Sequence, residues 1–340
     1  MRHFKTGKIP SDVLVRNVFR YGGSKDRSVI LGSSIGEDAA IIAFGKEMLV
    51  LKTDPVTGAA ADMGWLAVHI NANDVACRGA RPRWFLCDLL LPEGSDSSLV
   101  DSIMRQIDRA ARQIGVSVVG GHTEVTPGLN RPITVGYMVG VVDRGKFIAS
   151  DAARPGDHVI MTKSAAIEGA AVLAADYPQK IRKKGGAQLI AKAKLLRQQL
   201  SVVDDALISS GTGGVKAMHD PTEGGLLQGM WELAEASKVG FLIYESVIPV
   251  LPEIRQICAI FGVNPLRLMS SGCLLIAADK RKSNLIVNRL RSRGIPAQII
   301  GRFTPRSMGR TLVRDDGTLV EIGPQERDEL YRIFETPQSP

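Results

Sequence analysis

Acidic and polar side chains gather in five short clusters, each beside glycine, proline or asparagine in a turn-like context. The clusters span residues 36–40, 52–55, 71–74, 120–124 and 219–225. Several carboxylates brought together repel each other strongly unless a cation neutralises them. Hard oxygen ligands suit Mg²⁺, which binds through a few carboxylates plus phosphate oxygens, and glycine pairs let backbone N–H groups approach a phosphate. The clusters are therefore consistent with a site for Mg²⁺ and phosphate.

Each cluster also has a plain structural interpretation, which is the stronger one when a cluster is taken singly. Asp38 could be a turn acid, Asp54 an acid that ends a strand before proline, and Asp74 a surface acid within a helix. Gly120 and Gly121 alone are a weak phosphate-loop signal, because a tight turn after a strand needs the same residues. The sequence contains neither a P-loop nor a Rossmann fingerprint.

The histidines and cysteines leave their own alternatives open. His122 follows the glycine pair and could touch phosphate or a metal-bound water, or it could be a hydrogen-bonded structural histidine. Glu124 could help to bind metal or could pair with an arginine, and His219 is interpreted as structural. Cys77 and Cys273 are interpreted as small buried apolar residues rather than nucleophiles.

The first half of the chain must position most of these clusters. Hydrophobic periodicity and turn residues predict alternating elements: a strand at 46–54, a helix at 62–79, a strand at 83–92, a helix at 96–114, and strands at 116–119 and 133–142. This order predicts an α+β layer, with the helices on one face of a sheet.

A turn-rich segment near residues 150–156 marks a domain boundary. Beyond it we expect an α/β alternation: a strand at 158–162, helices at 165–175 and 187–200, a helix after Gly224, a strand at 273–278, a helix at 280–293 and a strand at 297–301. The predicted domains are 1–150 and 151–335, followed by a disordered tail at 336–340.

Length and composition agree with two globular domains. The chain has 340 residues, of which 44% are hydrophobic and 23% charged, so disorder of the whole chain is excluded. Apolar stretches are too short for a membrane span, the N-terminus lacks a signal-peptide core, and four scattered cysteines form no disulfide framework. We expect a cytoplasmic protein with reduced thiols.

The net charge of +8 is spread over both halves of the chain, which fits the attraction of anionic small molecules. Nucleic acid is disfavoured as a partner, because the basic run at 180–197 holds no aromatic residue for base stacking.

The order and spacing of the five clusters are more specific than any single cluster. Together they resemble the signature series of the PurM-like family, which includes aminoimidazole ribonucleotide synthetase, thiamine monophosphate kinase, selenophosphate synthetase and the hydrogenase expression/formation protein HypE. The resemblance runs from Gly7-Lys8 to about Arg302, and its strongest piece joins residues 73–76 to residues 79–82. Segments 220–225 and 270–277 look most like HypE.

The resemblance implies a two-domain fold with an N-terminal α+β domain, whose sheet pairs in a homodimer into a β-barrel, and a C-terminal α/β domain. It implies ATP and Mg²⁺ as cofactors. Carried over by motif and combined with the clusters, the metal set is Asp38, Asp54, Asp74 and Glu124; the ATP-binding set is Lys52, Asn73, Gly120, Gly121 and Thr123; and the catalytic set is Asp220, Lys8 and His122.

The implied activity is transfer of the ATP γ-phosphate to an oxygen of a small anionic or amide-bearing acceptor, in a kinase or a phosphate-activated dehydration or cyclisation. HypE ends in a cysteine that carries the carbamoyl group, whereas this chain has no cysteine after Cys273. That difference argues against self-modification. It leaves a second hypothesis, a non-catalytic ATP-binding maturation factor for a metalloenzyme such as a hydrogenase, acting with a protein partner.

Overall fold

The computed structural model describes residues 9, 11–21, 23–34, 39–57, 62–324 and 327–335. Two expected site residues, Lys8 and Asp38, lie outside the described residues, as does the expected tail at 336–340. The chain divides into two compact units. One consists of residues 27–32 and 38–147, and the other of residues 1–26, 33–37 and 148–340.

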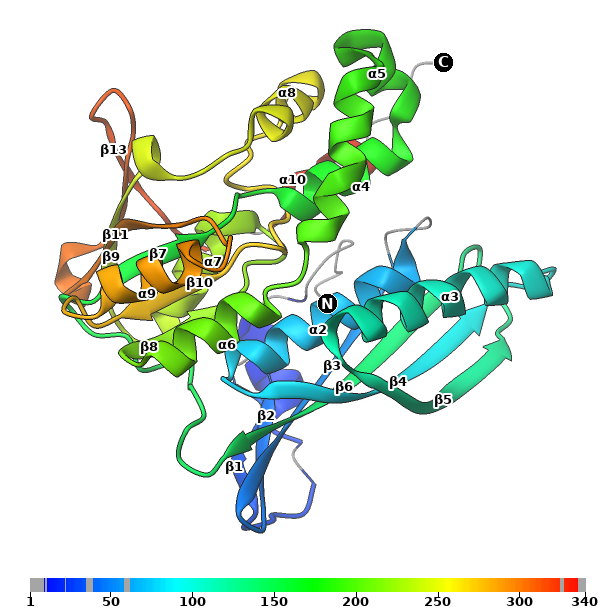
Figure 1. Ribbon diagram of the computed structural model, residues 1–340, viewed down its shortest axis with the longest axis horizontal. Coiled ribbons are helices and arrows are strands. Elements are labelled where there is room, and N and C mark those ends of the chain that lie inside the picture. The colour runs from blue at the N-terminus through cyan, green and yellow to red at the C-terminus, as the bar shows by residue number, and fades with distance from the viewer. Residues whose placement is uncertain are drawn as a thin grey trace. The chain divides into compact units, whose positions relative to one another are not determined.

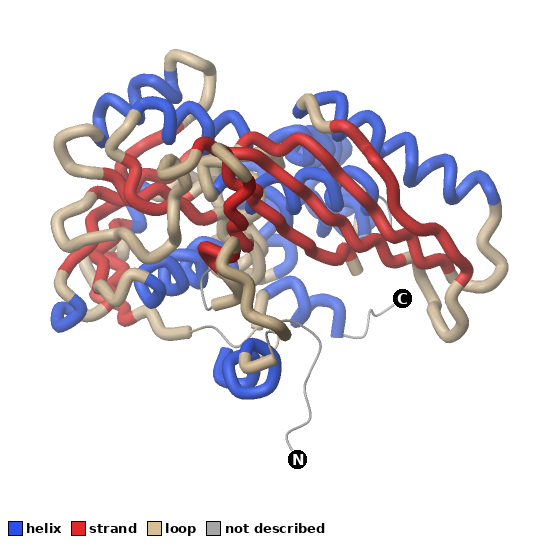
Figure 2. The backbone as a smooth tube through the Cα atoms, turned by 90° about the horizontal axis from the view of Figure 1, so that it is seen from below, coloured by secondary structure: helices blue, strands red, loops and turns tan. Residues whose placement is uncertain are grey.

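The first unit is built on a six-stranded sheet with the order β1-β2-β3-β6-β4-β5. The strands are β1 (Val29–Leu31), β2 (Ala40–Phe44), β3 (Glu47–Val56), β4 (Arg81–Leu91), β5 (Ser117–Val125) and β6 (Ile133–Asp143). Neighbouring strands run antiparallel except β4 and β5, which are parallel. A parallel pair needs a long crossover, and an intervening helix provides it. Figure 2 shows the long strands of this sheet side by side.

Helices α2 (Met63–Cys77) and α3 (Ser97–Ile114) cover one face of this sheet (Figure 1). Helix α3 is amphipathic: it starts at an Asp96 side chain that accepts the Leu99 N–H at 3.0 Å, and it ends at a left-handed Gly115. Helix α2 is buried on nearly all sides. It approaches β6 closely because Gly140 has no side chain; a Cβ there would lie 2.2 Å from Val75 Cγ1.

The second unit contains a seven-stranded sheet with the order β13-β12-β9-β11-β7-β10-β8. Its strands are β7 (His158–Thr162), β8 (Val215–His219), β9 (Gly240–Tyr244), β10 (Leu275–Ala278), β11 (Ala297–Thr304), β12 (Arg310–Val313) and β13 (Leu319–Glu321). Helices and strands alternate along the chain, yet the neighbouring strands are antiparallel except for β9 and β12.

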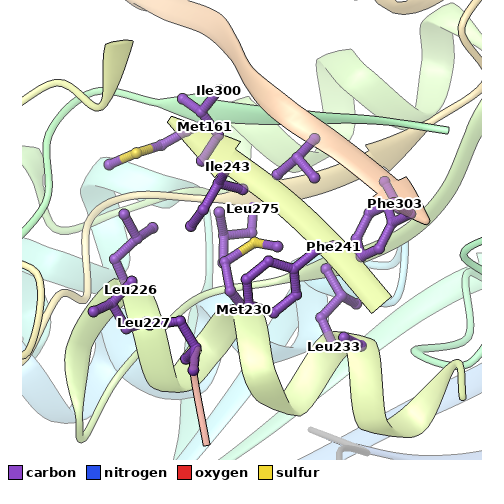
Figure 3. Close-up of a cluster of buried hydrophobic side chains, with 14 of the residues drawn as sticks. Met161, Leu226, Leu227, Met230, Leu233, Phe241, Ile243, Leu275, Ile300 and Phe303 are labelled. Carbon is purple, nitrogen blue, oxygen red and sulfur yellow. The ribbon is translucent and has the colours of Figure 1, made fainter. Parts of the chain in front are cut away.

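The helices of the second unit are α1 (Ser11–Leu14), the π-helix η1 (Val15–Phe19), α4 (Ile167–Asp176), α5 (Pro178–Leu196), α6 (Val203–Thr212), α7 (Gly225–Ala236), α8 (Pro252–Phe261), α9 (Ser283–Arg291) and α10 (Glu329–Glu335), with short 3₁₀ turns at 197–199, 245–247 and 306–308. Helix α7 packs its apolar face on β9 and β10. Figure 3 shows Leu226, Met230 and Leu233 of α7 against Phe241 and Leu275. This core fixes the point at which α7 begins.

Most of the expected elements are confirmed, including the two helices on one face of the first sheet. Two expectations are wrong in extent. The basic helix starts at Pro178 rather than 187 and is broken at Gly186 (φ 80°, ψ 172°). The strand expected at 116–119 continues to Val125, so residues 120–124 lie in a strand and not in a turn. Among the described residues, no helix is both long and apolar enough to cross a membrane.

Candidate active site

Three charged side chains from two elements meet on the helix-covered face of the first sheet. Lys52 and Asp54 on β3 follow the buried Met48 and Val50 at alternate positions, so they point toward α2. Lys52 Nζ lies 3.2 Å from Asp54 Oδ2 and 2.8 Å from Asp74 Oδ2 on α2. The Asp74 side chain is 6% exposed. One ammonium group thus pairs with two carboxylates, of which one is buried.

Asn71, one turn before Asp74 on α2, holds the backbone of Asp54 in place. Its Oδ1 accepts the Asp54 N–H at 2.8 Å, and its Nδ2 donates to the Asp54 carbonyl at 3.2 Å and to the Ala67 carbonyl at 2.9 Å. Gly136 stands opposite Asp54 in the sheet, and a Cβ there would lie 2.5 Å from Asn71 Nδ2. Asn71 was not assigned a role from the sequence, although its spacing of three from Asp74 places both on one helix face.

Three other expected site residues lie on α2 and β5: Asn73 on the helix, and Gly120 and Gly121 on the strand. Asn73 is completely buried within α2. Gly121 lies beside Cys87 of β4 with φ 147°, and a Cβ there would lie 1.9 Å from the Cys87 carbonyl oxygen. Gly120 is less constrained, with Leu86 Cδ2 3.8 Å from its hypothetical Cβ. The close approach of two strands therefore accounts for Gly121.

His122 and Glu124 form a pair on β5, with His122 Nε2 and Glu124 Oε2 3.1 Å apart. The Thr126 hydroxyl donates to the second oxygen of Glu124 at 2.9 Å. Hydrogen bonds from His122 and then from Thr126 lower the pKa of Glu124. Both side chains of the pair are exposed, as is every residue of β5.

This pair lies on the opposite face of the sheet from Lys52. In the parallel register His122 is beside Asp88, which alternates with the buried Cys87 and Leu89, whereas Thr123 is beside Leu89 on the helix-covered face. Strands β6 and β4 also separate β3 from β5, a distance of roughly 14 Å. Within one chain the fold brings Lys52, Asp54 and Asp74 together but not Thr123, His122 or Glu124. No group of three or more metal-binding side chains occurs in the described part of the chain.

Asp220 belongs to the second unit and directly follows β8. It is 1% exposed. Its neighbour His219 has its Nε2 3.1 Å from Glu232 Oε2 of α7, in keeping with the structural role expected for this histidine. Gly224 and Gly225 then turn the chain into α7 with φ values of 80° and 66°, a conformation that glycine adopts without strain.

Two buried carboxylates near Asp220 were not singled out from the sequence. Glu168 lies in the first turn of α4, and burial raises its pKa to about 7, helped by the negative charges of Asp328, Asp220 and Glu223. Burial likewise raises the pKa of Asp328, just before α10, to about 6. These residues come from segments far apart in the sequence, so no local pattern could have joined them.

All four cysteines of the chain are buried. Burial raises the pKa of Cys87 to about 11 and that of Cys258 to about 12, and it raises the pKa of Cys273 further still. The interpretation of Cys77 and Cys273 as buried apolar residues is confirmed. The raised pKa values of Cys87, Cys258 and Cys273 disfavour these three thiols as nucleophiles near neutral pH.

Two family models match most of the chain. The model of the AIR synthase related protein N-terminal domain matches residues 36–142, and that of the AIR synthase related protein C-terminal domain matches residues 154–314. The chain belongs to the AIR synthase related, or PurM-like, family.

Within this family the chain is similar to HypE proteins. It is 31% identical over 276 residues to carbamoyl dehydratase HypE of Cupriavidus necator. The aligned region covers 78% of this chain and 76% of that protein. The structure of a HypE–HypF complex aligns with a TM-score of 0.73 at 24% identity, covering 92% of this chain and 99% of that one. The hydrogenase maturation protein HypE in complex with ATP aligns with a TM-score of 0.68 at 22% identity, covering 96% and 97%.

Proposed function

We propose that this protein is an ATP-dependent enzyme that transfers the ATP γ-phosphate to an oxygen of a small acceptor. The observation that carries the proposal is the cluster of Lys52, Asp54 and Asp74, in which one ammonium lies within 3.2 Å of two carboxylates. A HypE relative in complex with ATP and the shared family fold support it.

The donor set fits Mg²⁺. Asp54 and Asp74 offer hard carboxylate oxygens close enough to share one cation, a place that the Lys52 ammonium takes in the structure. Bound there, Mg²⁺ would neutralise phosphate charge. Lys52 would then be free to contact a phosphate oxygen, and Asn71 would keep the Asp54 backbone fixed. We retain Asp220 as the proposed catalytic carboxylate of the second unit.

The acceptor is a separate molecule rather than a cysteine of this chain, because all four thiols are buried, and burial raises the pKa of Cys87, Cys258 and Cys273. We propose an amide or a carboxylate as the accepting group, since an oxygen phosphorylated in this way can leave in a dehydration or cyclisation. The kinase alternative keeps the phosphate on the acceptor. The same buried cysteines favour a second candidate, an ATP-binding maturation factor without catalysis.

We further propose a homodimer formed through the exposed strand β5, which would place His122 and Glu124 beside the second copy. A protein partner also belongs to the proposal, since a HypE relative forms a complex with HypF.

Calorimetric titration with Mg-ATP tests ATP binding directly. We expect the wild-type protein to bind, and Asp74→Asn to weaken binding by roughly 10-fold or more, because Mg²⁺ would lose one of its two proposed carboxylate ligands. Asp108→Asn is the matched control, since it removes a carboxylate from an exposed pair on α3. Folded wild-type protein that shows no heat of Mg-ATP binding would refute the proposal.

A panel of amide, carboxylate and phosphorylated metabolites then identifies the acceptor through stimulated phosphate release from ATP. The two candidates are separated by Asp220→Asn: the enzyme loses turnover, whereas a non-catalytic maturation factor still supports assembly of its partner.

A further inference from the structure

The glycine turn that follows Asp220 is anchored by a carboxylate from the end of the chain. Gly224 is the N-cap of α7, and its N–H donates to Asp328 Oδ2 at 2.6 Å, across 104 residues of sequence. The other oxygen, Asp328 Oδ1, accepts the Leu330 N–H at 2.8 Å. Asp328 is 2% exposed. One buried carboxylate therefore joins the start of α7 to the start of α10.

Tyr331, on the same short helix, makes a second contact with this segment. Its hydroxyl donates to Glu223 Oε1 at 2.7 Å. Aromatic contacts hold the helix itself: Phe334 packs on Tyr331 and on Tyr177, with ring centroids 6.4 Å apart in each case. Two consecutive residues of the segment 220–225 are thus bound by residues at the start of α10 and within it: Gly224 by Asp328, and Glu223 by Tyr331.

Further contacts of residues 220–225 form within the same unit. The Thr222 carbonyl accepts the Gly225 N–H at 3.1 Å and the Ser270 N–H at 3.3 Å. Leu226 and Leu227, in the first turn of α7, pack in the hydrophobic core shown in Figure 3. Between these supports lie two glycines with positive φ, which have little conformational preference of their own. Their geometry depends on outside anchors, and Asp328 is the one that binds the Gly224 N–H.

The position of the carboxylate also matters electrostatically. The free N–H groups at the start of a helix favour a negative charge, and α7 has 12 residues. The Asp328 carboxylate lies at this N-terminus of α7 and accepts the Gly224 N–H. Hydrogen bonds from Leu330, Gly224 and Met269 stabilise its charged form and partly offset the effect of burial.

We propose that Asp328 and Tyr331 are positioning residues, which hold the segment 220–225 so that Asp220 keeps its working geometry. The role assigned to Asp220 rests on the proposed function. Neither residue needs to touch a substrate: Asp328 acts through the Gly224 amide and Tyr331 through Glu223.

Hydrogen–deuterium exchange combined with ATP turnover tests this inference. In Asp328→Ala we expect the Gly224 amide to exchange roughly 10-fold faster, because it loses its acceptor. Tyr331→Phe keeps the ring packing and removes only the hydroxyl, so a folded protein with faster exchange around Glu223 is expected. Arg332→Ala is the control on the same helix, because Arg332 bonds the Gly262 carbonyl instead.

A merely structural role would not produce the expected kinetic pattern. We expect kcat for ATP turnover to fall roughly 10- to 100-fold in Asp328→Ala with KM for ATP nearly unchanged, a smaller fall in Tyr331→Phe, and none in Arg332→Ala. Unchanged Gly224 exchange, or equal losses in the control, would overturn the inference. Absence of ATP binding in the wild-type protein would refute the proposed function instead. The exchange rate of the Gly224 amide in Asp328→Ala would then still test whether Asp328 anchors this turn.

Discussion

Lys52 makes the candidate site interdependent at the level of single residues. Its ammonium lies between Asp54 and Asp74, so removal of Lys52 would leave two neighbouring carboxylates without the cation that they share. The positions of these side chains depend in turn on a neutral residue, Asn71, which binds both backbone groups of Asp54.

Asn71→Ala is therefore expected to destabilise the protein by roughly 2 to 4 kcal/mol, because three hydrogen bonds are lost in a fully buried place. Urea denaturation followed by circular dichroism measures the change. Asn264→Ala serves as the control: this exposed residue accepts the Leu266 N–H through its Oδ1, and we expect the loss of this one hydrogen bond to cost less than about 1 kcal/mol. Equal losses in both variants would contradict the role given to Asn71.

Glu168 gives the stability of the protein a pH dependence. Its pKa is about 7 in the folded protein and near 4.5 when unfolded, so the folded state binds the extra proton between these values. Its contribution is fully present below pH 4.5 and is lost as the pH rises toward 7; Asp328 acts in the same direction. We expect Glu168→Gln to flatten this fall and to stabilise the protein at pH 8 by up to about 3 kcal/mol. Urea midpoints at pH 5 and pH 8 measure the effect, and parallel profiles for both proteins would contradict it.

Single residues were predictable from the sequence only where a local motif marked them. Asp54 and Asp74 stand out by their clusters, and the structure brings them together. Asp328 and Glu168 could not be found in this way, because their partners lie about a hundred or fifty residues away in the sequence. Residue spacing also could not show that Glu124 and Asp54 lie on opposite faces of the sheet, since that depends on strand order.

At the scale of elements, the long periodic segments were predictable and the short ones were not. Helix α3 carries a clear apolar stripe and a capping aspartate, so its limits follow from the sequence. Strands β1 and β12 have three and four residues and show too little alternation to be recognised. The sequence predicts an end for strand β5 at residue 119, because its two glycines resemble a turn. In the structure the strand continues to Val125, and Gly121 permits close contact with β4.

The glycine pair of β5 offers a matched comparison. Gly121→Ala places a Cβ 1.9 Å from the Cys87 carbonyl oxygen, and we expect a loss of roughly 3 kcal/mol or protein that does not fold. Gly120→Ala meets only an ordinary contact and should change stability by less than about 1 kcal/mol. Thermal unfolding of both variants measures the difference, and a stable Gly121→Ala protein would show that the strands can separate at no cost.

For the whole molecule, the feature that bears on assembly is the exposed edge strand β5 of the first sheet. All nine residues of β5 are exposed, and Val118, Val119 and Val125 are exposed by 39%, 55% and 54%. An uncovered apolar edge strand pairs readily with another chain. This is the structural basis for the proposed homodimer.

Val119→Lys should therefore shift the protein from dimer to monomer in analytical ultracentrifugation, with the fold intact by circular dichroism. Leu285→Lys is the control, since Leu285 is similarly exposed at 49% but lies on α9 of the other unit. Wild-type protein that sediments as a monomer at all concentrations would exclude this use of the edge.

The link between Asp328 and Gly224 also bears on how the chain is made. A ribosome releases the polypeptide from its N-terminus onward, and domains generally fold as units during synthesis. The first sheet is complete once residue 143 has emerged, long before the rest of the protein. The cap of α7 arrives only with residue 328, 104 residues after the glycine that it binds. The glycine turn of the second unit therefore lacks this anchor until residue 328 has emerged from the ribosome.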